Sequence, residues 1–279
     1  MTTTATPPET DVQPYVRLPR HRRSEEGATP LKMVPEPLAS SVPVVSLVIP
    51  TKNEARNVAW VLDRLPALVD EVILVDSSSD DTVAVAQAVR PDIRVVREAR
   101  PGKGAALRAG FAHAHGEYIV MIDADGSMAP AEIGRFVEEL ADGAELVKGS
   151  RFMAGGGTAD MGALRRYGNG GLRSLVNSLY GCRFSDLCYG FMAFRRSKLD
   201  ALDLRSDGFE IETEIVVRAL LAGLRIAEVP SFEALRRHGE SNLNTWRDGT
   251  RVLRTLLRER WAGEVERDVV GPLALEPVV

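Results

Sequence analysis

The sequence predicts an α/β fold built on a doubly wound, mostly parallel sheet flanked by helices. Short apolar runs rich in β-branched residues alternate with segments of helical spacing. Of the 279 residues, 44% are apolar, which is enough for one large α/β domain or two small ones. Ligands bind beyond the carboxyl ends of the strands in such sheets, so we expect the functional site there.

Five strands and their helices follow from this alternation. The expected strands are the apolar runs 44–50, 71–76, 93–96, 117–123 and 145–152. Helical spacing follows these runs at 54–68, 83–90, 102–115 and 130–140. The segment SSSDDT (77–82) combines a turn with the residue types that begin helices. Beyond 152 we expect a flexible lid at 154–162, because this segment is rich in glycine.

The folded domain is expected at 45–261, between two tails. Residues 1–44 contain eight prolines and no sustained apolar period, so this segment is expected to be disordered. Residues 262–279 form the second expected tail. The net charge of −4 does not indicate a general nucleic-acid binder. Two cysteines and no apolar signal core favour a reduced, cytoplasmic protein.

Carboxylates and amides follow three of the strands. Asn53 and Glu54 follow the first, Asp76 ends the second, and Asp123-Ala124-Asp125 ends the fourth. Crowded carboxylates cost several kcal/mol unless a cation compensates them. In extended backbone Asp123 and Asp125 point to the same side, and such oxygen ligands suit Mg²⁺ or Mn²⁺. For Asn53 a helix-capping role remains an equal alternative.

Several phosphate-binding and catalytic motifs are absent from the sequence. No G-x-G-x-x-G follows the first strand, and the G-K pair at 102–103 lacks the other residues of a Walker A loop. No G-x-S-x-G nucleophile elbow occurs either. These observations disfavour a nicotinamide dehydrogenase, a P-loop enzyme and an α/β-hydrolase.

Six ordered segments resemble family 2 glycosyltransferases of the GT-A fold, and within them the dolichol-phosphate or polyprenyl-phosphate mannosyl- and glucosyltransferases. The segments are VSLVIPTKNEARNV (45–58), ILVDSSSDDT (73–82), the block from RPGKG to DADGSMAP (100–130), SDLCYGFMAFRR (185–196), GFEIETEIVVRA (208–219) and RRHGESNL (236–243). Two positions depart from the family pattern. Ser77 replaces an aspartate, and Asn242 stands where lysine is usual.

The resemblance implies a nucleotide-binding half at 45–152 and an acceptor half with a C-terminal helix at 153–261. Nucleotide-sugar contacts are implied for Pro50, Asn53, Glu54, Asp76, Lys103, Asp123, Ala124 and Asp125. A Mg²⁺ or Mn²⁺ ion on Asp123 and Asp125 would offset the charge of the diphosphate leaving group. Lys103 begins a glycine-rich helix, where free N–H groups and a cation favour anions. We expect Gly102 and Gly104 to let the backbone approach the ligand.

The residues that would act on the acceptor have several candidates each. Asp186 is the first candidate for a catalytic base, with Glu212 and Glu214 as alternatives; a lipid-phosphate acceptor is already ionised and needs no strong base. We expect Arg166, Arg236 and Ser241 to bind phosphate. His238 is a candidate third metal ligand, and a surface histidine is the equal alternative.

The C-terminal helix places four arginines on one face: Arg247, Arg251, Arg254 and Arg258. The plain interpretation is a solvated face over an apolar stripe that includes Trp246, Leu253, Leu256 and Leu257. The alternative is an amphipathic helix that contacts an anionic membrane. In that case the cytoplasmic protein would be peripheral on the inner face of the membrane.

The resulting hypothesis is a metal-dependent enzyme that transfers a hexose from a UDP- or GDP-sugar to polyprenyl phosphate, with inversion. One alternative is the same fold acting on a small soluble acceptor, as in glucosyl-3-phosphoglycerate synthases. A sugar-nucleotide-binding module without turnover is a third hypothesis, disfavoured by the intact D-x-D motif. No nucleic-acid partner is expected, and the oligomeric state stays open.

Overall fold

The computed structural model describes residues 43–240 and 245–270, with side chains to residue 261. All but the last two residues of the expected N-terminal tail, and the candidate phosphate ligand Ser241, lie outside the described residues. Within the described ranges, every helix is too short or too polar to cross a bilayer.

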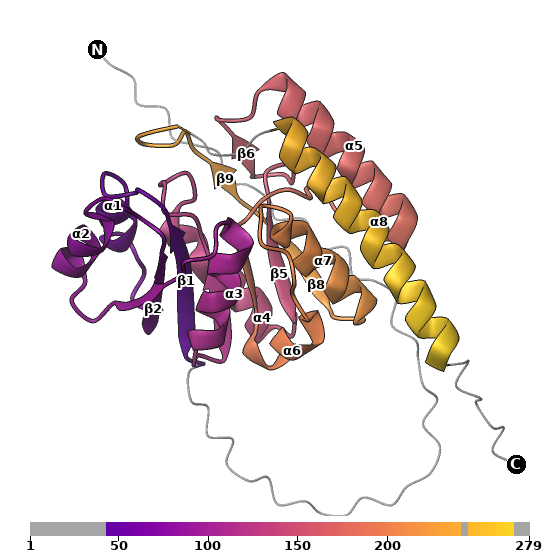
Figure 1. The fold of residues 1–279 in the computed structure, drawn as a ribbon, viewed down its shortest axis with the longest axis horizontal. Helices are drawn as coiled ribbons and strands as arrows, with labels where there is room; N and C mark the ends of the chain where they lie inside the picture. Colours follow the sequence, from indigo (N-terminus) through magenta and orange to yellow (C-terminus); the bar gives the residue numbers. More distant parts are fainter. Residues whose placement is uncertain (1–42, 241–244, 271–279) are drawn as a thin grey trace, which may run out of the picture. The chain divides into compact units, whose positions relative to one another are not determined.

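A seven-stranded sheet, in the order β3-β2-β1-β4-β7-β5-β8, forms the centre of the molecule (Figure 1). The strands are β1 Val45–Thr51, β2 Glu71–Asp76, β3 Arg94–Arg97, β4 Tyr118–Met121, β5 Leu146–Ser150, β7 Met192–Arg195 and β8 Ile226–Pro230. Only β7 among them runs antiparallel to its neighbours, β4 and β5. The mostly parallel sheet expected from the sequence is therefore confirmed.

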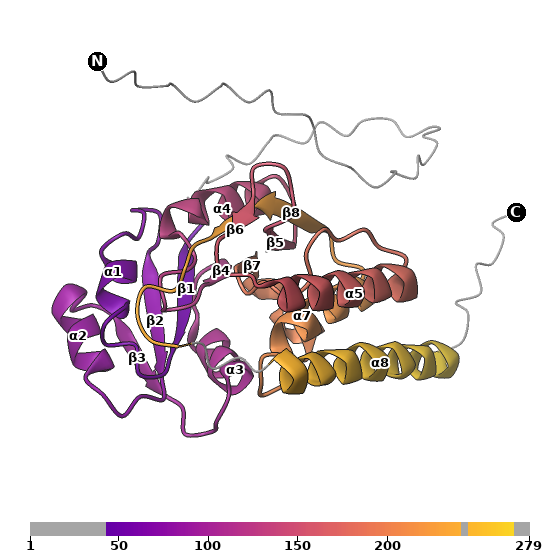
Figure 2. The same cartoon turned by 90° about the horizontal axis from the view of Figure 1, so that it is seen from above.

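Helices cover both faces of the sheet. They are α1 Val58–Leu62, α2 Thr82–Val89, α3 Lys103–His113, α4 Ile133–Ala141, α5 Ala163–Tyr180, α6 Leu199–Leu202, α7 Ile211–Leu221 and α8 Thr245–Val270. Two short 3₁₀ turns, η1 Pro130–Glu132 and η2 Arg196–Lys198, precede α4 and α6. Figure 2 shows α4 and α3 on opposite sides of the central strands.

Successive side chains along a strand point to opposite faces of the sheet, and they form two hydrophobic cores. Leu47 and Ile49 of β1 pack in the core beneath α1 and α4, whereas Val48 packs in the core with α3 and α7. Helix α4 buries Ile133, Phe136 and Leu140, which recur at helical spacing. The sheet is buried on both faces, which is why its strands read as continuous apolar runs.

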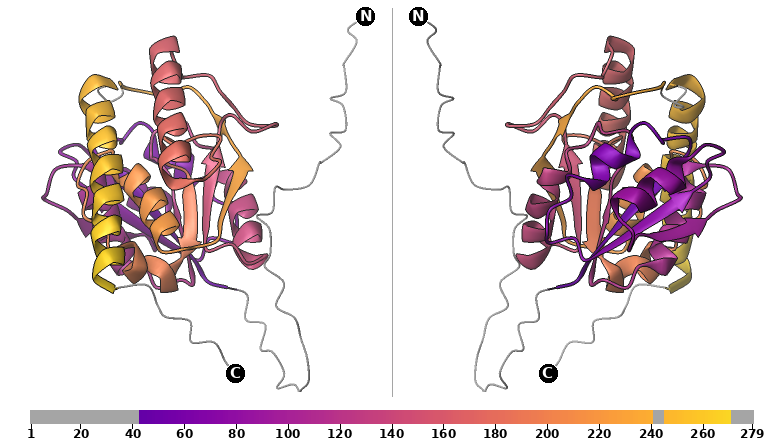
Figure 3. Two further views of the ribbon diagram at one scale, coloured as in Figure 1. Left: turned by 90° about the vertical axis from the view of Figure 1, so that its right-hand side faces the viewer. Right: turned by 90° about the vertical axis from the view of Figure 1, so that its left-hand side faces the viewer.

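The long helices α5 and α8 run side by side on the α3 and α7 side of the sheet (Figure 3). The hydroxyl of Tyr180 in α5 donates to the carbonyl of Leu256 in α8 at 2.7 Å. Helix α8 continues to Val270, beyond residue 261, where the sequence placed the end of the folded domain. The apolar stripe expected on α8 is only partly buried, because Leu256 is buried but Trp246 and Leu253 are exposed.

The segment expected as a lid contains β6 (Gly157–Thr158), which pairs in parallel with β9 (Phe232–Glu233). The carboxylate of Glu233 accepts a hydrogen bond from the Thr158 hydroxyl at 2.6 Å. This two-stranded element joins the segment after β5 to the segment after β8. It brings residues 75 positions apart together beside the carboxyl ends of the main strands.

Candidate active site

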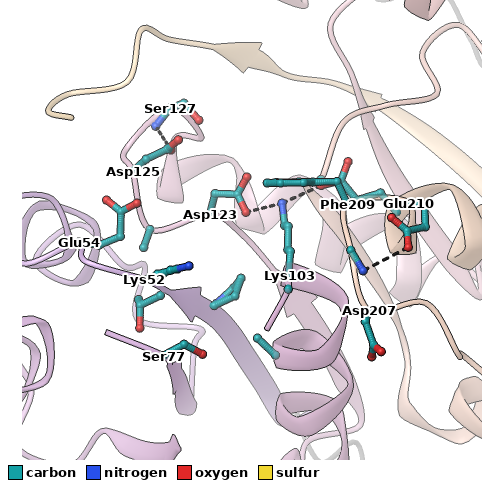
Figure 4. A pocket seen from close by; sticks show the side chains of 18 of the residues that line it. Lys52, Glu54, Ser77, Lys103, Asp123, Asp125, Ser127, Asp207, Phe209 and Glu210 are labelled. Atoms are coloured by element: carbon teal, nitrogen blue, oxygen red, sulfur yellow. Dashed lines mark hydrogen bonds and ion pairs between the residues drawn. The ribbon is translucent and has the colours of Figure 1, made fainter. Parts of the chain in front are cut away.

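A cavity of about 750 Å³ lies beyond the carboxyl ends of β1 and β4. Figure 4 shows part of its lining, with Lys103 reaching from α3 toward Asp123. Eight residues expected at the site line this cavity: Pro50, Glu54, Lys103, Asp123, Ala124, Asp125, Glu212 and Arg236. Residues distant in the sequence thus meet where the sheet topology predicted.

Lys103 links the two halves of the site. Its ammonium lies 2.5 Å from the Asp123 carboxylate and 2.7 Å from that of Glu212, and its side chain is only 9% exposed. Gly190 leaves room for this pair, because a Cβ there would lie 2.5 Å from Glu212 Oε1. Glu212 belongs to α7 and Lys103 to α3, so the contact joins these two helices.

Burial and nearby charges shift both partners in this cluster. Burial raises the pKa of the Asp123 carboxyl to about 6; Asp125 and Glu212 act in the same direction and Lys103 acts against it. Burial also disfavours the charged Lys103, but Asp123 and Glu212 outweigh it and raise the pKa of the lysine. Excess negative charge is therefore concentrated where the D-x-D motif faces the cavity.

Arg236 binds the other carboxylates of the cavity floor. Its guanidinium lies 3.2 Å from Asp125 and forms a second, close ion pair with Glu54. Asp125 also accepts the backbone N–H of Ser127 at 2.9 Å, and Gly126, with φ of 76°, turns the chain between them. A loop after β9 therefore supplies a cation directly to the D-x-D motif.

Asp76 and Asn53 shape the site from behind the cavity wall. Asp76 is buried, accepts a hydrogen bond from the Thr51 hydroxyl at 2.9 Å and forms an ion pair with Arg97. Asn53 has φ of 59° and accepts the backbone N–H of Ser79 at 2.9 Å. Both residues hold the loop that contains Ser77, and Ser77 itself lines the cavity.

The glycines at the start of α3 approach another loop of the chain, where the sequence suggested a ligand. The N–H groups of Gly104 and Ala105 donate to the Asp207 carbonyl at 2.8 and 3.2 Å. A Cβ on Gly102 or Gly104 would collide with the backbone of residues 206–207. These two N–H groups are consequently occupied, although Gly102 and Lys103 both line the cavity.

Asp186, the first candidate base, is fully buried away from the cavity. Arg151 donates to both of its oxygens, at 2.7 and 3.0 Å, and Asn169 donates at 3.0 Å. Burial acts to raise the pKa of Asp186, but Lys148 and Arg151 hold it below its usual value. This carboxylate is engaged in holding the fold and is not placed to accept a substrate proton.

Glu214, like Asp186, is held by hydrogen bonds inside the fold, whereas Glu212 lines the cavity. Glu214 is fully buried and accepts the N–H of Ser206 at 2.8 Å and a guanidinium N–H of Arg258 at 3.2 Å. It thereby ties α7 to α8 and to the loop before α7. Of the three carboxylates considered as bases, Glu212 is the one that lines the cavity.

Two further candidates lie outside the cavity. Arg166 is exposed and lies over the ring of Phe152, with 5.9 Å between the guanidinium carbon and the ring centroid. His238 is exposed, 3.3 Å from Arg56. Within the described part of the chain, no three His, Cys, Asp or Glu side chains gather as a metal site. The structure thus does not bring His238 together with Asp123 and Asp125.

Other cavity residues were not singled out as site residues from the sequence. Arg165 lines the cavity in place of its neighbour Arg166 and forms an ion pair with Asp160 at 3.1 Å. Arg247 and Arg251 of α8 also line it, although their spacing had suggested a solvent or membrane face. The spacing of these arginines shows in the sequence that they share one face of a helix. Whether that face borders the cavity, solvent or a membrane depends on how α8 packs.

Comparisons with known proteins agree with this geometry. Residues 46–203 match the model of glycosyl transferase family 2. The undecaprenyl-phosphate mannosyltransferase of Micrococcus luteus is 32% identical over 240 residues, covering 78% of this chain and 96% of that protein. The dolichol-phosphate mannosyltransferase of Pyrococcus furiosus is 30% identical over 237 residues, covering 81% of this chain and 66% of that protein.

A solved structure is also similar. It is glucosyl-3-phosphoglycerate synthase from Mycobacterium tuberculosis in complex with Mn²⁺, UDP-glucose and phosphoglyceric acid, with a TM-score of 0.64 and 28% identity. The match covers 79% of this chain and 80% of that one. Sheet order, D-x-D position and these matches lead to one conclusion: the chain is a GT-A enzyme that belongs to glycosyltransferase family 2.

Proposed function

We propose that the protein transfers a hexose from a UDP- or GDP-sugar to polyprenyl phosphate, with inversion and with Mg²⁺ or Mn²⁺ as cofactor. The observation that carries this proposal is the cavity floor, where Asp123 and Asp125 lie beside Lys103 and Arg236. Such a floor offers both carboxylates for a cation and cations for a diphosphate.

The donor set fits a divalent cation that is completed by substrate. Magnesium in phosphate-transferring sites takes one or two carboxylates and fills its remaining positions with phosphate oxygens and water. Asp123 and Asp125 would hold the ion, which would neutralise the charge that develops on the leaving diphosphate. The similar synthase was solved in complex with Mn²⁺ and UDP-glucose.

The surroundings of the candidate bases favour an acceptor that is already ionised. Asp186 and Glu214 are buried and hydrogen-bonded, which leaves Glu212, whose Oε1 is paired with Lys103, as the one of the three that could take a proton. A hydroxyl acceptor requires a carboxylate with a free oxygen to take its proton, whereas a phosphate acceptor attacks through an existing oxyanion. The mannosyltransferase relatives are named for polyprenyl and dolichol phosphates.

A soluble phosphate acceptor is the second candidate. The supporting observation is the similarity to a synthase whose complex contains phosphoglyceric acid. Both acceptors carry a phosphate group that the cavity cations could bind, but phosphoglycerate would accept the sugar on its hydroxyl and would need a base to take the proton. They differ in whether the enzyme must work at a bilayer surface.

The deciding experiment incubates the full chain with UDP-glucose, GDP-mannose or GDP-glucose and Mn²⁺, with undecaprenyl phosphate in detergent or 3-phosphoglycerate as acceptor. We expect a glycosyl phosphate product from one donor with undecaprenyl phosphate, and its loss on chelation by EDTA. Product with 3-phosphoglycerate alone would select the soluble acceptor. Donor binding without any transfer or hydrolysis would contradict the proposed function.

A further inference from the structure

The wall of the cavity that α8 contributes is rich in arginine. Arg247 and Arg251, one helical turn apart, both line the cavity. Between them in the sequence, the buried carboxylate of Asp248 lies 3.6 Å from Arg247 Nε and 3.4 Å from Arg251 Nη1. The two arginine side chains remain 63% and 44% exposed, so they stay accessible from the cavity.

Two cations beside the D-x-D motif are already engaged with acids. Lys103 contacts Asp123 and Glu212, and Arg236 contacts Asp125 and Glu54. Those four contacts commit the two cations to the D-x-D end, where the donor diphosphate is expected. The arginines of α8 belong to a different element and pair with Asp248, not with the acids of that cluster.

We propose that Arg251, together with Arg247, recognises the phosphate monoester of the acceptor, with Asp248 as the residue that positions both guanidinium groups. This inference rests on the proposed function and assigns its acceptor specificity to α8. A guanidinium has five N–H donors, so Arg251 can bind phosphate oxygens while Nη1 keeps its contact with Asp248. The phosphate of a prenyl lipid and that of a soluble metabolite present this same chemistry.

The test is a calorimetric titration of the full chain, preloaded with UDP and Mn²⁺. The probes are farnesyl phosphate, 3-phosphoglycerate and, as the uncharged match, farnesol. We expect wild-type protein to bind at least one phosphate probe and Arg251→Ala to weaken that binding by about tenfold or more, the effect of losing a charge-assisted hydrogen bond. Arg251→Lys should retain part of the binding, because it keeps the charge and loses the planar fork.

Arg254→Ala is the matched control, since it removes the same charge from the same helix outside the cavity wall. It should leave the affinity for the phosphate probes unchanged, and all variants should bind UDP as the wild type does. Asp248→Asn should weaken phosphate binding less than Arg251→Ala. Binding of farnesyl phosphate alone assigns the phosphate to a lipid, and binding of 3-phosphoglycerate alone assigns it to a soluble metabolite; both support the inference.

Three results would overturn the inference: no binding of either phosphate by the wild type, unchanged binding by Arg251→Ala, or an equal loss in Arg254→Ala. Failure of the proposed function looks different. A wild-type protein that transfers no sugar but binds phosphate through Arg251 would refute the function and keep the inference. Normal transfer to a phosphate acceptor by Arg251→Ala, with an unchanged acceptor KM, would support the proposed function and refute the role of Arg251.

Discussion

Asp123 and Asp125 lie two residues apart but have different partners. Lys103 approaches Asp123 from α3, and Arg236 approaches Asp125 from the loop after β9. The two carboxylates thus draw together residues from the beginning, middle and end of the domain. Their position after β4 was predictable from the sequence, because a buried apolar run ends just before them.

Replacement of Asp125 by alanine should abolish transfer while the protein stays folded. The carboxylate lies at the cavity floor and would hold the metal, so its loss should lower kcat by roughly a hundredfold or more. Turnover with Mn²⁺ present is the measurement. The exposed Asp63, which pairs with Arg64, provides a control in Asp63→Ala. Wild-type turnover in Asp125→Ala would contradict the metal assignment.

Lys103→Met should destabilise the protein, because it leaves the carboxylates of Asp123 and Glu212 close together without their cation. Breaking a buried ion pair on one side costs about 3–5 kcal/mol. Urea unfolding should therefore show a lower free energy of unfolding. The double variant Lys103→Met/Glu212→Gln should recover part of the loss, because one of the two repelling charges is gone. Additive losses in the double variant would refute this coupling.

The sequence could not reveal which carboxylates are already bound by neighbours. Asp76 has the residue type and strand-end position expected of a functional group, and Asp186 lies in a segment that resembles the family. Their partners, Arg97 and Arg151, lie 21 and 35 residues away. Such pairings depend on strand order and helix packing, which the sequence does not show. The residues predicted from the sequence therefore include both residues that line the cavity and residues that support its wall.

At the scale of elements, a buried ionic network joins β5, the segment before β7 and β9. Arg151 follows β5 and binds Asp186, the carboxylate of Glu233 at 3.1 Å and the carbonyl of Cys188. Its guanidinium also lies 4.7 Å from the ring centroid of Tyr189. Because Tyr189 and Glu233 line the cavity, this network fixes part of the cavity wall.

Asp186→Asn should lower the free energy of unfolding by about 3–5 kcal/mol, because it removes one of the two ionised partners of the buried Arg151 and leaves only Glu233. The folded-state pKa of Asp186 is lowered, so its contribution is present above the unfolded pKa of about 3.9 and is lost as the pH falls through the folded value. The difference between wild type and variant should therefore narrow below about pH 4. Chemical unfolding of both proteins at pH 7 and at lower pH measures this difference in free energy of unfolding. A difference that does not change with pH would contradict the role of the ionised Asp186 carboxylate.

The elements themselves were largely predictable, and the exceptions have physical reasons. The expected strands lie within a few residues of the observed ones, because strands buried on both faces show continuous apolar runs. The expected helix 54–68 contains only α1 at its centre, since Pro66 interrupts it. The antiparallel direction of β7 leaves no signal in its own residues, because its side chains are buried whichever way the strand runs.

At the scale of the molecule, a lipid acceptor requires the cavity to work at a bilayer surface. Trp246 at the start of α8 is 75% exposed and Tyr167 of α5 is 80% exposed. Exposed aromatic side chains next to arginines favour a membrane interface, where rings and cations both find partners. The exposed part of α8 therefore supports peripheral membrane contact as a proposal.

The full chain should then co-sediment with anionic vesicles at low salt and be released above a few hundred millimolar salt. Each arginine near such a surface contributes on the order of 1 kcal/mol, which salt screens. Trp246→Ala and Arg254→Glu should each weaken vesicle binding and leave UDP affinity unchanged. Neutral vesicles are the control. Absence of sedimentation with either kind of vesicle at low salt would favour the soluble acceptor.

The contact between the start of α3 and residues 206–208 has a consequence for engineering hybrid enzymes. Gly102 and Gly104 leave no space between this helix and the backbone that leads into Glu212. A chimera that takes α3 from one family member and α7 from another must reproduce this contact to within the size of a methyl group. A side chain at position 104 would push the loop away and separate Glu212 from Lys103, even if every residue of both parent sites were retained. In such a hybrid, the paired segments 102–105 and 206–208 should therefore come from the same parent.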